Sequence, residues 1–75
     1  MDIHHLVSMV NQIGEFWDTE YGSDKAPPAI ASHIARFWEP RMRREIILYA
    51  QAGGPGLSPS AQAAVLTLPL PAARR

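Results

Sequence analysis

Cysteine is absent from this chain of 75 residues. Disulfide bonds and thiolate metal sites are therefore excluded, and the fold depends on one small hydrophobic core. Seven basic and seven acidic residues cancel to a formal net charge of zero. Nucleic-acid-binding domains usually carry a clear positive excess, so the charge balance argues against that class.

Long hydrophobic runs are absent as well. No apolar stretch approaches the roughly 20 residues that a membrane span needs. The N-terminus also lacks the basic and apolar regions of a secretion signal. These features predict a cytoplasmic protein that does not contact a membrane. Hydrophobic residues still make up 47% of the chain, which is typical of a globular protein.

Apolar residues recur at spacings of three and four along most of the chain, which is the period of an α-helix. This pattern predicts a helix over about 2–18, a loop over 19–28 and a second helix that ends before Pro40. A third helix is expected over about 40–52 and a short fourth over about 59–68. The expected fold is all-α, a small bundle of three main helices plus a short fourth helix.

Residues 1–68 are predicted to form this single helical domain, and the proline-rich residues 69–75 an extended, flexible C-terminal tail. Asp2 and Ser58 are expected to cap the first and fourth helices. Gly14 indicates either close packing or a bend in the first helix, or a frayed last turn. The sequence leaves these alternatives open.

Two of the predicted helices carry more apolar surface than one inward face can use. Met9 and Phe16 lie about 100° or more from the centre of the first apolar stripe. The four consecutive apolar residues 46–49 cover about 300° of the third helix. This surplus apolar surface, which includes Phe16 and Leu48, predicts a contact with another molecule. Each of these residues alone could also be an ordinary exposed apolar side chain.

Signatures of catalysis and of metal binding are weak. The three histidines His4, His5 and His33 form no His-x-x-x-His or Glu-x-x-His pair. No serine lies in a nucleophile-elbow context, and residues 53–56 lack the lysine of a phosphate-binding loop. The chain is therefore expected to be no enzyme and to bind no metal or cofactor.

A basic cluster surrounds Pro40, next to Phe37 and Trp38; its members are Arg36, Arg41, Arg43 and Arg44. A helix-turn-helix would also use a short turn here, so a small DNA-binding regulator remains an alternative. The interleaved Glu39 and Glu45 weaken that hypothesis. Arginine beside aromatic residues is equally typical of a protein–protein hot spot, which we favour.

Three segments carry a family resemblance, namely Leu6–Gly14 followed by Phe16, His33–Arg43, and Gly53–Pro59 with the pair Ala64-Val65. They resemble the small delta subunit of NAD-dependent, molybdenum-containing formate dehydrogenase. The resemblance runs from about Leu6 to Leu68, and 36–43 is its most specific piece.

This resemblance implies a non-catalytic accessory subunit in a hetero-oligomer with the large catalytic subunit. In such a complex the large subunit carries bis-molybdopterin guanine dinucleotide and iron–sulfur clusters, and smaller subunits bring FMN and the NAD site. The delta subunit has no redox centre, which agrees with the lack of cysteine. The family is associated with assembly, cofactor maturation or stability of the complex.

We expect the turn over 37–44 to dock on the catalytic subunit, with Trp38 as apolar anchor and Phe37 in the core. Arginines would pair with acidic residues around the anchor, and Asn11 and Gln12 would lie at the rim. The full predicted partner-binding set is Asn11, Gln12, Phe16, Arg36, Trp38, Arg41, Arg43, Arg44 and Leu48. A self-associating helical module without a larger partner is a further alternative.

Overall fold

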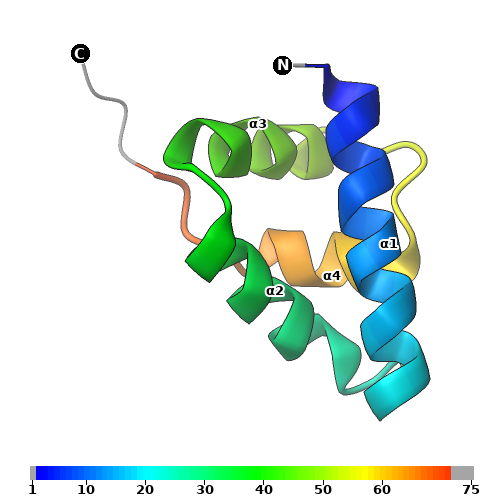
Figure 1. The fold of residues 1–75 in the computed structure, drawn as a ribbon. Helices are drawn as coiled ribbons and strands as arrows, with labels where there is room; N and C mark the ends of the chain where they lie inside the picture. The colour runs from blue at the N-terminus through cyan, green and yellow to red at the C-terminus, as the bar shows by residue number, and fades with distance from the viewer. Residues whose placement is uncertain (1, 72–75) are drawn as a thin grey trace.

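Four α-helices make up the structure, a computed structural model in which residues 2–71 are described (Figure 1). They are α1 (Ile3–Tyr21), α2 (Ala26–Phe37), α3 (Pro40–Gln51) and α4 (Pro59–Leu66). No strand occurs among residues 2–71, so the predicted all-α class is confirmed. The last four residues of the predicted tail, 72–75, lie outside the described part of the chain.

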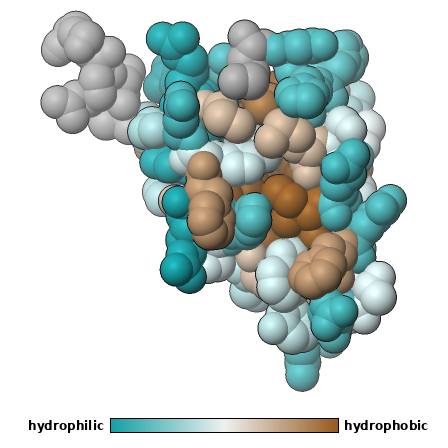
Figure 2. All heavy atoms as spheres, viewed as in Figure 1, coloured by the Kyte–Doolittle hydropathy of each residue, from teal (hydrophilic) through white to brown (hydrophobic). Residues whose placement is uncertain are grey.

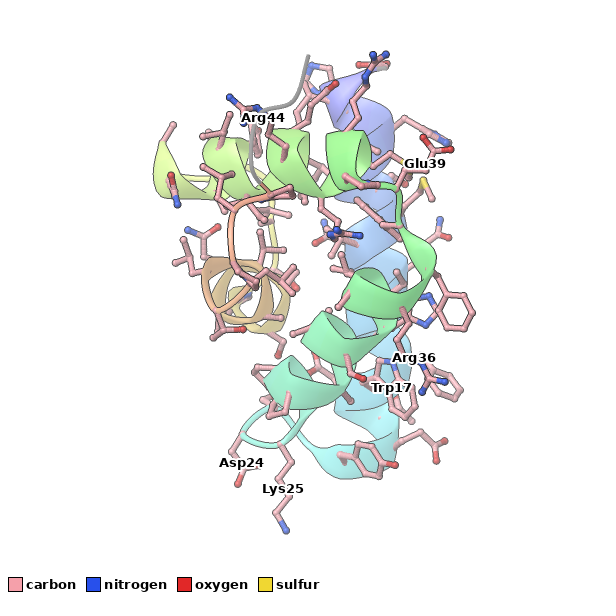
Figure 3. The ribbon with its side chains drawn as sticks, turned by 90° about the vertical axis from the view of Figure 1, so that its left-hand side faces the viewer. Trp17, Asp24, Lys25, Arg36, Glu39 and Arg44 are labelled. Atoms are coloured by element: carbon pink, nitrogen blue, oxygen red, sulfur yellow. The ribbon has the colours of Figure 1, made fainter. Side chains whose placement is uncertain are left out.

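The helices pack around α4 (Figures 1 and 3). Helices α1 and α2 diverge from their connecting turn like the arms of a V, and α3 crosses near the open end. Helix α4 lies behind this frame and contacts each of the other three helices. The side of α1 and α2 that faces away from α4 is therefore not covered by another helix of the chain.

All four helices contribute to one hydrophobic core. Its largest fully buried side chains are Leu6, Val10, Ile30, Ile34, Ile46, Ile47 and Val65. The spacing of four between Leu6 and Val10, and again between Ile30 and Ile34, places each pair on one helix face. Burial of each such side chain contributes about 1.5–3 kcal/mol to folding. The four inward residues predicted for the last helix, Ala61, Ala64, Val65 and Leu68, are all buried.

Both predicted N-caps are confirmed. The Asp2 carboxylate accepts a hydrogen bond from the N–H of His4 at 3.0 Å. The Ser58 hydroxyl accepts one from the N–H of Ala61 at 3.2 Å. Each side chain satisfies a backbone donor that the first turn of a helix leaves free.

The predicted loop over 19–28 is wrong at both ends, because the actual turn spans only Gly22–Lys25. Helix α1 continues to Tyr21, whose ring stacks on Trp17 at a centroid distance of 5.2 Å. Gly22 ends the helix with φ +87°, a conformation that favours glycine. On the other side, prolines in the first turn of α2 replace N–H groups that no helical partner would satisfy.

Helix α3 is less exposed than its four apolar residues suggest. Ile46 and Ile47 are both fully buried, because α3 packs against α1 and α4. Leu48 is the member of this run that remains exposed, at 42%. Met9 of α1, also predicted to lie outside the inward stripe, is partly buried against the core. The surplus apolar surface is therefore smaller than the sequence predicts.

Gly14 is buried seven residues before the end of α1, so the alternative of a frayed last turn is wrong. A Cβ atom at this position would lie 3.6 Å from Ile30 Cδ1 and 3.6 Å from Ser58 Oγ. Gly14 therefore faces α2 and the start of α4 at ordinary packing distance, with room for one methyl group.

Candidate partner-binding surface

A shallow groove of about 250 Å³ lies between α1 and α2 on the side away from α4. Its lining residues are Trp17, Tyr21, Ala29, Ser32, His33, Arg36 and Phe37. The spacing of four between Trp17 and Tyr21 places both on one face of α1. The positions 29, 32, 33 and 36 likewise form one face of α2, turned away from the buried Ile30 and Ile34.

Aromatic rings build both walls of this groove. On α1, Trp17 stacks on Tyr21, and Phe16 meets Trp17 edge-on at a centroid distance of 4.8 Å. On α2, the rings of His33 and Phe37 lie 4.8 Å apart. Such ring pairs favour one relative orientation of the two rings and so restrict the side chains of this surface. We call the six residues Phe16, Trp17, Tyr21, His33, Arg36 and Phe37 the aromatic face.

Much of the exposed apolar area of the chain belongs to the aromatic face. Phe37 is 70% exposed, Phe16 56% and Tyr21 53%. In Figure 2, apolar side chains gather over α1 and α2, with hydrophilic side chains around them. Exposed aromatic side chains that lie together in this way are typical of a protein interaction site.

Arg36 is the charged member of the aromatic face. Its guanidinium carbon lies 6.0 Å from the centroid of the Phe37 ring. Figure 3 shows Arg36 and Trp17 on the same side of the molecule, projecting from α2 and α1. Among the hydrogen bonds and ion pairs within residues 2–71, none involves the Arg36 guanidinium, in contrast to Arg43 and Arg44. Its donors therefore remain available for an external acceptor.

The structure reverses the sequence-based assignment of Phe37 and Trp38. Trp38 is 5% exposed and belongs to the core, whereas Phe37 projects into solvent. Trp38 follows the last helical residue and has an extended backbone, φ −92° and ψ 140°. It lies four residues after the buried Ile34, so the spacing that places Ile30 and Ile34 on one face also directs Trp38 towards the core. Trp38 cannot serve as a projecting anchor in this conformation.

The predicted arginine cluster does not converge on one site. Arg43 donates a hydrogen bond from Nη1 to the carbonyl oxygen of Trp38 at 2.6 Å, and Arg44 reaches the carbonyl of Pro71 at 3.5 Å. Arg41 is exposed on α3. Two of the four guanidinium groups are thus used within the chain, and Arg36 belongs to a separate surface.

Asn11 is used within the chain as well. Its Nδ2 donates to the carbonyl of Gly56 at 2.9 Å, and its Oδ1 accepts from the N–H of Ser58 at 3.0 Å. These bonds fasten the loop before α4 to α1 and give Asn11 a structural role. Gln12, Phe16 and Leu48 are exposed, as the prediction of a partner surface requires.

Sequence reasoning did not include Trp17, Tyr21 or His33 in the partner-binding set. It assigned Trp17 to the inward stripe, which agrees with the packing of Trp17 against the core, Tyr21 to a loop and His33 to the edge of a packed face. The spacing of four in the pairs 17/21 and 33/37 was a usable signal, because such pairs are neighbours on a helix surface.

Metal binding and membrane insertion find no support in the described residues. Residues 2–71 contain no group of three or more His, Asp or Glu side chains that could hold a metal ion. None of the described helices has the length and hydropathy to cross a membrane.

Comparison with protein families identifies the chain. The family described as NADH-dependent formate dehydrogenase delta subunit (FdsD) matches residues 5–65. The chain belongs to this family. Comparisons with curated proteins and with solved structures gave no match.

The match to the delta-subunit family includes the whole aromatic face and every residue of the predicted partner-binding set. The resemblance to this family is thereby confirmed over residues 6–65. Members of the family are, by description, subunits of a larger enzyme, which implies a hetero-oligomer. The aromatic face is thus a candidate for the contact with another subunit.

Proposed function

We propose that this member of the delta-subunit family is a non-catalytic accessory subunit that binds the large catalytic subunit of a cytoplasmic NAD-dependent formate dehydrogenase. The family match over residues 5–65 carries this proposal. An open surface of aromatic residues and one arginine supports it, since tryptophan, tyrosine and arginine are enriched at interaction hot spots.

The proposed contribution to the complex is assembly, cofactor maturation or stability. A partner that binds only the folded catalytic subunit stabilises that subunit by mass action. If the cofactor-loaded form is bound more tightly, the same effect favours maturation. Bis-molybdopterin guanine dinucleotide, iron–sulfur clusters, FMN and NAD are assigned to the other subunits, and none to this chain.

Co-purification tests the proposal. The tagged chain, expressed with the other subunits, is expected to bring down a large protein whose metal and flavin analysis gives molybdenum, iron and FMN. Deletion of the chain should lower the yield or the molybdenum content of that protein. Recovery of the chain alone, with unchanged yield of the enzyme, would contradict the proposal.

The two alternatives predict different outcomes in the same preparation. A DNA-binding regulator would bind duplex DNA with an affinity that falls steeply with salt. Against it, Arg43 and Arg44 are bonded to backbone carbonyls of the chain. A self-associating module would form a stable dimer without any other subunit, which light scattering would detect.

A further inference from the structure

We infer that the groove on the aromatic face binds a segment of the catalytic subunit in which a carboxylate side chain lies next to an apolar one. This inference rests on the proposed function and adds the site on this chain and the chemistry of its occupant. It follows from the shape of the groove, its ring walls and the charge of Arg36.

The shape of the groove suits one or two protein side chains. The small residues Ala29 and Ser32 lie among its lining residues and leave space between the aromatic walls. The volume of about 250 Å³ is below the roughly 300–1,000 Å³ of most small-molecule sites, and the groove is open along its length. It therefore fits the side chains of a docked segment better than a cofactor.

The walls of the groove supply the apolar half of the recognition. Trp17 and Tyr21 form one wall and Phe37 the other. Their ring contacts favour these orientations before any partner arrives, which lowers the conformational entropy lost on binding. An apolar side chain placed between these walls would remove the exposed ring surfaces from water.

Arg36 supplies the polar half of the recognition. No carboxylate lines the groove, and none of the hydrogen bonds within residues 2–71 involves the guanidinium. Covering the groove with a purely apolar segment would leave this charge desolvated and unpaired, which is strongly unfavourable. A carboxylate on the partner would accept two parallel hydrogen bonds from the planar guanidinium.

Two other occupants fit the charge pattern less well. In a two-fold symmetric dimer centred on the groove, each Arg36 would meet the same aromatic face, which has no carboxylate in its lining. A nucleic acid would meet a chain of zero net charge and a single arginine in the groove. Charge complementarity therefore favours an acidic segment of another protein.

Substitution of Arg36 tests the charge requirement. We expect Arg36→Gln to weaken binding to the purified catalytic subunit by about thirtyfold or more, the effect of losing one partner of a desolvated ion pair. Lys25→Gln is the matched control, because it removes one positive charge from an exposed position in the turn, outside the groove (Figure 3). Circular dichroism should show both variants folded, since both side chains are exposed.

Cross-linking identifies the occupant. A photoreactive p-benzoylphenylalanine in place of the exposed Phe37 is expected to attach to the catalytic subunit in the assembled complex. The labelled peptide should contain Asp or Glu next to an apolar residue. Exchange of that acidic residue for Arg should restore binding to Arg36→Glu.

In the binding assay, an affinity of Arg36→Gln within twofold of that of the unsubstituted chain would overturn the inference. In the cross-linking experiment, three results would overturn it: a cross-link to a peptide without Asp or Glu, a cross-link to a second copy of this chain, or no cross-link in a complex that still forms. In each case the unsubstituted chain still co-purifies, so the proposed function stands and only the groove is excluded. If the unsubstituted chain does not bind at all, both proposals fail together.

Discussion

The side-chain amide of Asn11 joins α1 to the start of α4, because its Oδ1 accepts a hydrogen bond from the N–H of Ser58 at 3.0 Å. The same side chain donates to the carbonyl of Gly56. One residue of the first helix thus fastens the glycine-rich loop that leads into the last helix. A residue that the sequence suggests for a partner contact is instead part of the internal framework.

Replacement of Asn11 by Ala is expected to lower the free energy of unfolding by about 1–3 kcal/mol, because two hydrogen bonds are lost. The exposed neighbour Gln12 provides the control, since Gln12→Ala should change stability by less than about 0.5 kcal/mol. Urea denaturation followed by circular dichroism measures both. Equal effects of the two substitutions would argue against the structural role of Asn11.

Alanine substitutions at the neighbouring positions 37 and 38 should affect different properties, binding at position 37 and stability at position 38. Trp38→Ala removes a large core side chain and should cost about 3–5 kcal/mol. That is comparable with the total stability of about 3–5 kcal/mol available to a chain of this size, so the variant alone should be largely unfolded. Phe37→Ala should stay folded and lose affinity for the catalytic subunit. Denaturation and binding assays on the same two proteins distinguish these outcomes, and a stable Trp38→Ala would refute the assignment.

Arg43 and Arg41 offer a second matched pair. Arg43→Ala removes the hydrogen bond to the Trp38 carbonyl at the C-terminal end of α2, where a positive charge is also favourable. We expect the free energy of unfolding to fall by about 1–2 kcal/mol. This value is at the lower end of the range for a hydrogen bond from a charged group, because the site is only partly buried. Arg41→Ala, at an exposed position, should leave the melting temperature nearly unchanged. A larger effect at Arg41 than at Arg43 would contradict this account.

Two glycines are predicted to respond to alanine in opposite directions. Gly14 lies inside α1 with room for a Cβ atom, so Gly14→Ala should stabilise the chain by about 0.5–1 kcal/mol. Gly54 has φ +58°, and a Cβ atom there would collide with Gln62 Oε1. Gly54→Ala should therefore destabilise by more than about 1 kcal/mol. Thermal unfolding of both variants provides the comparison, and a shift of the same sign in both would count against these packing distances.

The fold was largely predictable because helix periodicity and helix boundaries are local properties. The stripes through Leu6 and Val10 and through Ile30 and Ile34 are visible without any structure. Caps such as Asp2 and Ser58, and the break before Pro40, depend on side-chain chemistry within a few residues. The length of the turn after α1 was predicted wrongly, because helix α1 continues to Tyr21 and ends at Gly22.

The candidate surface depended on tertiary structure to a greater degree. Trp38 continues the spacing of four set by Ile30 and Ile34 and is buried with them, whereas Phe37, at the end of α2, is exposed because no other described helix covers it. Whether an arginine is available depends on carbonyl groups brought near by the fold, as with Arg43 and Arg44. No local sequence pattern shows which arginines lie near such carbonyl groups.

The sequence by itself determined a cysteine-free, all-α chain of zero net charge and its membership of the delta-subunit family, because composition, periodicity and motif are properties of the linear chain. Tertiary structure alone decided that the open surface is the groove between α1 and α2. Helix α4 covers the opposite side of these two helices, so the groove lined by Trp17, Tyr21, Arg36 and Phe37 is not covered by any helix among residues 2–71. Such a surface arises from helix packing, in which residues far apart in sequence become neighbours.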